Sequence, residues 1–215
     1  MGVEQQQRQC AALHRIDLKV RLGADAHLKL YLNQTPLLEW TGDLSDLVAQ
    51  TIDTLRLRAA DTFNAGISFA GYWSEVIVAE RDTRTLHLKT LAPKADGESE
   101  WTGSYTDINE IIASEATTIY TDVVDRTATF EVTGMPAGDF SVRAVRISGR
   151  AVRAETGPTG IQMGVEVGEA QGFSETILVD QGWQPVSTMF ATNPVTGQAW
   201  KPSEISALKL ALKSK

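Results

Sequence analysis

The chain has 215 residues, a net charge of −7 and a single cysteine, and 42% of its residues are hydrophobic. This length suffices for one large domain or two small ones, each with its own core. The lone Cys10 excludes an intrachain disulfide and a cysteine-based zinc cluster. The acidic balance argues against direct nucleic-acid binding, because neutralisation of phosphate charge supplies most of that affinity.

The apolar pattern of the sequence predicts no membrane helix and no secretory signal. No apolar run approaches the roughly 20 residues that a membrane helix needs. The N-terminal stretch lacks the apolar segment of a secretory signal, and Gln6 stands where a myristoylation signal requires Ser or Thr. We therefore expect a chain that folds in a cytoplasm and makes no membrane contact.

Alternation of apolar and polar residues dominates the pattern and predicts half-buried antiparallel strands. Clusters of turn-forming residues, such as Gly157 to Gly160, separate these strands. Many short strands at this spacing are typical of β-sandwiches and jelly rolls. The sequence therefore predicts an all-β protein of two β-sandwich, jelly-roll-like units with minimal helix. The clearest alternating segments are 15–22, 27–33, 54–59 and 161–167.

A stretch rich in Pro, Gly and charged residues suggests where the two units divide. We expect a first unit over residues 1–92, a linker over 93–103 and a second unit over 104–215. Helix is expected only in short pieces. Residues 45–55 could form one turn, and 105–116 could begin at Asp107, with Glu110 completing a capping box.

No arrangement of side chains predicts catalysis, a cofactor or a metal. A hydrolytic triad needs a base close to a nucleophile, but the three histidines lie on the polar faces of predicted strands. A glycosidase needs a carboxylate pair, yet Glu75 and Glu80 point to opposite faces of a regular strand. We therefore expect a protein that is not an enzyme. The histidines are His14, His27 and His87.

The tryptophans suggest a glycan-binding site, because exposed indole rings stack on sugars. Trp101 and Trp183 lie beside glycines in predicted loops and are the candidate glycan-binding residues. Trp40, Trp73 and Trp200 lie at strand ends, where packing in a core or corner is the expected role.

Arginines recur along one predicted strand and form a candidate interface. The alternative is that they pair across strands with Glu131, Glu155 and Glu166. The four arginines are Arg143, Arg146, Arg150 and Arg153.

The C-terminal stretch predicts a structural corner. Pro194 and Gly197 suit a turn, Trp200 is expected to pack at the corner, and Pro202 suits the start of one helical turn. Leucines then alternate with lysines from Leu208 onward as a closing strand.

The motif Asn193-Pro194-x-Thr196-Gly197-x-Ala199-Trp200, followed by a Leu-Lys-Leu strand, resembles the C-terminus of structural proteins from tailed bacteriophages. Residues 72–110 and 132–168 are similar to the middle segment and following sandwich of such tail-fibre, spike and decoration proteins. Residues 14–45 resemble the second half of a concanavalin-like (laminin-G-type) jelly roll, with paired strands around a turn. A complete jelly roll has further strands before this point, so we expect an apolar face that another subunit or virion protein covers.

This resemblance implies a non-enzymatic virion structural or adaptor protein of the tail, neck or capsid. It would fold in the host cytoplasm and assemble as a homo-oligomer, with a trimer as the favoured stoichiometry. Its other partners would be phage virion proteins. The alternative is a carbohydrate-binding, lectin-like module that recognises a host-surface glycan. Fold alone does not decide between them.

Overall fold

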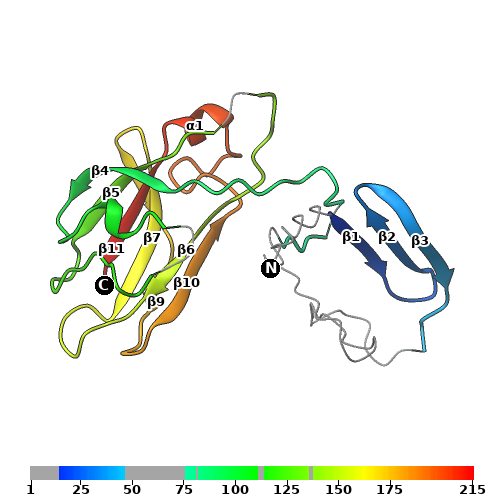
Figure 1. Ribbon diagram of the computed structural model, residues 1–215, viewed down its shortest axis with the longest axis horizontal. Coiled ribbons are helices and arrows are strands. Elements are labelled where there is room, and N and C mark those ends of the chain that lie inside the picture. Colours follow the sequence, from blue (N-terminus) through cyan, green and yellow to red (C-terminus); the bar gives the residue numbers. More distant parts are fainter. Residues whose placement is uncertain (1–14, 47–75, 81, 111–113, 136–137) are drawn as a thin grey trace, which may run out of the picture. The chain divides into compact units, whose positions relative to one another are not determined.

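The computed structural model describes residues 15–46, 76–80, 82–110, 114–135 and 138–215. Strands hold 42% of these residues and helices 5%, and the sheets are antiparallel. The predicted all-β class is confirmed. Figure 1 shows the elements in chain order. The predicted strand at 54–59 and helical turn at 45–55 lie outside the described residues, apart from Ser45 and Asp46.

The chain divides into two compact units, Met1–Leu88 and Lys89–Lys215. The division lies just before the expected linker, and that linker is largely a strand. Strand β4 (Pro93–Ser99) pairs with β5 (Thr127–Val132) in the second unit. The charged, glycine-containing composition that suggested a linker is that of an edge strand, where charges prevent unwanted pairing.

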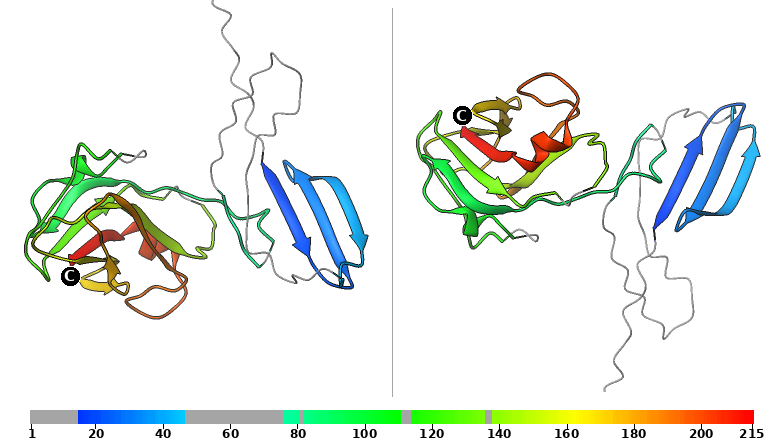
Figure 2. Two further views of the ribbon diagram at one scale, coloured as in Figure 1. Left: turned by 90° about the horizontal axis from the view of Figure 1, so that it is seen from below. Right: turned by 90° about the horizontal axis from the view of Figure 1, so that it is seen from above.

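The first unit holds a three-stranded sheet of β1 (Ile16–Arg21), β2 (Ala26–Leu32) and β3 (Thr35–Gly42). The three strands lie side by side in both views of Figure 2. Asn33 and Gln34 join β2 to β3 with φ values of 50° and 70°, which is the backbone of a tight two-residue hairpin. Among the described residues of this unit, no second sheet completes the expected sandwich.

The second unit is a β-sandwich. One sheet is six-stranded, with β4, β5, β11, β7 and β8 in that order and β9 also paired to β7. The other sheet pairs β6 with β10. The remaining strands are β6 (Val145–Ala151), β7 (Gly160–Val167), β8 (Ala170–Phe173), β9 (Ile177–Leu178), β10 (Gln184–Phe190) and β11 (Lys209–Ser214).

Side chains from both sheets meet in the core of the second unit. Phe130 of β5 and Met163 of β7 are buried in one cluster with Val186 of β10. A second cluster is built around Val165 and Trp200, with Phe190 packed against it. The predicted inward alternation of β7 is confirmed, because Met163 and Val165 are both buried.

The two described helices are short. Residues Tyr105–Asp107 form the 3₁₀ turn η1, so the expected helix start at Asp107 is wrong. The Asp107 carboxylate turns back and accepts the Ser104 amide at 2.9 Å, so Asp107 caps the start of η1 from its third position and does not begin a helix of its own. Pro202–Ser206 forms α1 with proline at its start, as predicted.

Candidate functional site: the two faces of the first sheet

Strand register collects the apolar side chains of the first sheet on one face. Leu18 lies opposite Leu30, and Leu30 lies opposite Leu38. Directly opposed residues share a face of the sheet, and so do residues two apart along a strand. We call this surface the apolar face. It consists of Ile16, Leu18, Val20, Leu28, Leu30, Leu32, Leu38 and Trp40.

Half of the apolar face is open to solvent. Ile16 is 53% exposed, Leu18 and Leu38 are each 52% exposed, and Trp40 is 43% exposed. The register shifts where Leu37 enters β3 as an extra residue, and this leucine is exposed as well. Large contiguous apolar patches are uncommon on soluble proteins and mark sites of interaction.

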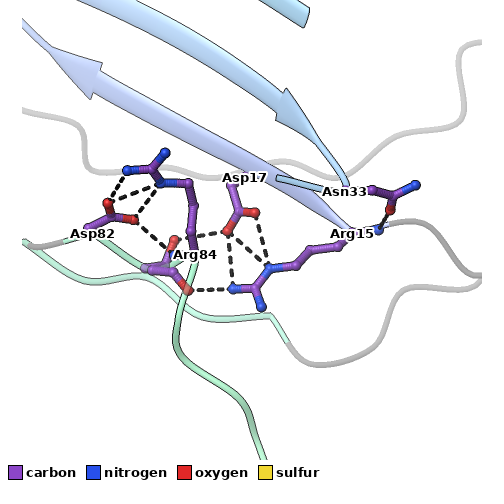
Figure 3. Close-up of polar contacts among 6 residues, drawn as sticks. Arg15, Asp17, Asn33, Asp82 and Arg84 are labelled. Carbon is purple, nitrogen blue, oxygen red and sulfur yellow. Dashed lines mark hydrogen bonds and ion pairs between the residues drawn. The ribbon is translucent and has the colours of Figure 1, made fainter. Parts of the chain in front are cut away.

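The opposite face of the same sheet is charged, and a returning segment of the chain covers part of it. Figure 3 shows Asp17 between Arg15 and the segment that carries Asp82 and Arg84. Arg15 Nε donates to Asp17 Oδ2 at 3.1 Å, and Thr83 Oγ1 donates to Asp17 Oδ1 at 3.2 Å. Arg15 also donates to the Thr83 carbonyl. We call Arg15, Asp17 and Thr83 the clasp.

Arg84 extends this cover over an aromatic ring. Its guanidinium lies 4.6 Å from the ring centroid of Tyr31, a cation–π distance. Arg84 Nε donates to Asp82 Oδ1 at 2.9 Å. This hydrogen bond is the main reason that the pKa of Asp82 lies below its ordinary range and that of Arg84 above it. Tyr31 and Asp17 are both buried.

A second charged group lies on this covered side. Lys29 Nζ lies 2.6 Å from Glu39 Oε1, and His27 Nε2 lies 3.2 Å from the same oxygen. The hydrogen bond between Lys29 and Glu39 raises the pKa of the lysine and lowers that of the carboxyl. The sheet therefore separates its charges onto one face and its apolar side chains onto the other.

The two candidate glycan-binding tryptophans differ in what their rings contact. Trp101 is half-buried against the second unit's core, and its indole Nε1 donates to the Arg126 carbonyl at 3.0 Å. Trp183 is half-buried in the loop before β10, and its carbonyl accepts Arg150 Nη2 at 3.5 Å. The structure gives no contact that joins the two rings.

The other tryptophans divide between packing and exposure. Trp200 is buried at the predicted corner, where its indole donates to the Phe190 carbonyl at 2.9 Å. Gly197 has the positive φ, 71°, that the predicted turn requires. Trp40 was expected to pack in a core or corner, and this is wrong, since its ring is on the open apolar face. Trp73 lies outside the described residues.

The arginine candidates do not form one stripe with shared partners. Arg150 forms an ion pair with Glu115 at 2.5 Å, and Arg146 Nη2 donates to Ser187 Oγ at 3.3 Å. Both are exposed on β6, as is Arg143 before it, whereas Arg153 is half-buried. Glu131 and Glu166, two of the expected cross-strand partners, pair with Lys94 and Lys209 instead.

The residues considered for metal binding and catalysis do not lie together among the described residues. The part of the chain that the structure describes contains no cluster of three metal-ligating side chains. Of the two carboxylates considered for catalysis, Glu75 lies outside the described residues and Glu80 is exposed; the nearby Asp82 pairs with Arg84. Residues 76–79 form no strand. His14 is not described, His27 neighbours Glu39, and His87 is exposed.

Comparisons with protein-family models, with curated proteins and with solved structures give no match. Across the described residues, no helix is both long and apolar enough to cross a membrane.

Proposed function

We propose that this chain is a non-enzymatic structural or adaptor component of a tailed-bacteriophage particle, in its tail, neck or capsid, and that it acts through oligomeric assembly. The observation that carries the proposal is the open apolar face of the first sheet. A surface of this kind is stabilised by covering it with another surface, and the covered area is what a structural protein uses to fix geometry. The assignment to a phage particle is supported by the resemblance of the C-terminal motif, residues 193–200, to phage structural proteins.

A trimer is the first stoichiometry to test. Packed sheets lie about 10 Å apart, so three sheets around one axis would each lie about 5 Å from it. The triangle that they enclose then has sides of about 17 Å, or three to four strands at about 4.8 Å spacing. The first sheet has three strands, which is close to this width.

The mass of the purified chain in solution tests the assembly. We expect light scattering to give a multiple of the 23.4 kDa chain mass that persists on dilution, and three times that mass for the trimer. A monomer at micromolar concentration contradicts the proposal. Mass spectrometry of purified particles from a phage that encodes the chain tests its place in the virion, where we expect several copies.

The glycan-binding alternative now depends on Trp183. Trp101 has a structural role through Arg126, so Trp101→Ala confounds folding with binding. Trp183 is not among the side chains packed against either core cluster of the described residues. A glycan array with the wild-type chain and Trp183→Ala decides the matter, with Trp101→Phe as the matched control. Glycan binding that only Trp183→Ala abolishes would favour the lectin-like function.

A further inference from the structure

We infer that the partner on the apolar face is the same face of another copy of this chain. This inference deepens the proposed function, on which it rests, by naming the surface and the occupant. In the trimer, the apolar faces of three copies would meet around the shared axis, with Leu18, Leu30 and Leu38 crossing the centre of each face.

The first argument is charge. Every residue that the register places on the apolar face is uncharged, from Ile16 on β1 to Trp40 on β3. Two identical faces can therefore meet without burying a charge or opposing like charges, both of which are costly. A charged partner would find no charged side chain on this face with which to form an ion pair. Identical uncharged surfaces meet this condition in any closed symmetric arrangement, including three copies around one axis.

The second argument is that the reverse face is charged and already partly covered. The clasp and Arg84 cover Asp17 and Tyr31 there, and Lys29 pairs with Glu39. A sheet packs against one layer on each face. On the charged face the segment at Thr83 and Arg84 already covers Asp17 and Tyr31, and the exposed residues around them, such as Lys19 and Arg21, are charged. The apolar face is therefore the one that a neighbouring copy can cover without burying charge.

The third argument is area. With four of its side chains about half exposed, the face offers on the order of 500 Å² of accessible surface per copy, comparable to the largest patch on a typical monomer. Two copies together then remove about 1,000 Å², which is the lower bound for a specific interface. The face is therefore large enough for self-association, and patches of this size on monomers are often functional.

The test introduces one charge into the face of the full-length chain. In Leu18→Lys, the new ammonium would be buried unpaired between copies, so we expect the dissociation constant to rise about 100-fold or more. Leu38→Lys on β3 repeats the test at a second position in case the first variant folds poorly. Met189→Lys is the matched control, because Met189 is 68% exposed on β10 of the other unit.

Light scattering over a dilution series, with circular dichroism and thermal melting for each variant, gives the outcomes. The inference predicts an oligomer for the wild type and for Met189→Lys, and well-folded monomers for the two face variants. If the face variants keep the wild-type mass, the interface lies elsewhere: the inference fails and the proposed assembly stands. If the wild type is a monomer, both fail, and a lower melting temperature of Leu18→Lys would then show that the chain covers its own face.

Discussion

The indole of Trp40 lies over Gly42, two residues further along β3 on the same face of the sheet. A β-carbon placed on Gly42 would lie 2.7 Å from Cη2 of the Trp40 ring, closer than two carbon atoms can approach. The glycine therefore leaves the space that lets the ring lie down along the strand. This relationship shapes the end of the apolar face.

Gly42→Ala should lift the Trp40 ring from the strand without unfolding the sheet. Alanine suits a strand better than glycine does, by about 0.5–1 kcal/mol, and this offsets part of the cost of moving the ring. We expect a red-shifted Trp40 fluorescence, obtained by subtracting the spectra of the corresponding Trp40→Phe chains. Gly149→Ala is the control, since a β-carbon there would meet nothing within 4 Å. An unchanged Trp40 spectrum would contradict this account.

Trp200 should matter more to stability than Trp101, although each indole donates one hydrogen bond to a backbone carbonyl. Trp200 is buried, so Trp200→Phe leaves the Phe190 carbonyl without its donor, at a cost of about 1–3 kcal/mol. Trp101 is half-buried, and water can replace its indole. We expect Trp101→Phe to lower the free energy of unfolding by less than about 1 kcal/mol. Urea unfolding of both variants measures the difference, and equal losses would refute the ranking.

The pair of Glu166 and Lys209 should make the second unit sensitive to acid. Burial raises the pKa of Glu166, but hydrogen bonds from Gln171 and Lys209 outweigh it, and the pKa lies below its ordinary 4.5. A carboxyl with a lowered pKa contributes stability that is present above pH 4.5 and is lost as the pH falls through the folded-state pKa. The Lys209 pKa is raised above 10.5 by the hydrogen bond with Glu166, so its contribution is lost only above that pH.

Glu166→Gln should therefore lower the urea midpoint at pH 7 and flatten its decline between pH 5 and pH 3. Glu131→Gln is the matched control, because Glu131 faces Lys94 across 3.5 Å with both side chains about half exposed. Exposed pairs of this kind contribute about 0–1 kcal/mol. A Glu166→Gln profile parallel to that of the wild type would show that this pair does not set the acid response.

Strands could be predicted because their signal is local. Alternation at Ile161 to Val167 and from Leu208 onward needs only neighbouring residues to be read, and β7 and β11 lie there. The corner at Trp200 was likewise predictable, since Pro, Gly and Trp each have a specific geometric role. Short-range patterns were therefore sufficient to predict the class of fold and most of the C-terminal architecture.

The features that could not be predicted depend on contacts between residues distant in sequence. Alternation in β1 divides its side chains into two sets, but it cannot tell which set will be covered. Asp17 is buried because Thr83, 66 positions away, returns to it, while Leu18 beside it stays exposed. The Ser104–Asp107 contact was within reach of sequence reasoning, but Glu110 offered an equally good capping pattern.

The clasp should hold the segment around Arg84 against the sheet. Asp17 is 7% exposed and accepts hydrogen bonds from Arg15 and Thr83. Asp17→Ala leaves the Arg15 guanidinium partly buried without its carboxylate, which costs about 1–3 kcal/mol. Local opening exposes the backbone to proteases, so we expect trypsin to cleave after Arg84 several-fold faster than in the wild type. Asp25→Ala is the control, because Asp25 is exposed and lies 3.9 Å from Arg21. Equal cleavage rates in the two variants would mean that Asp17 does not fasten this segment.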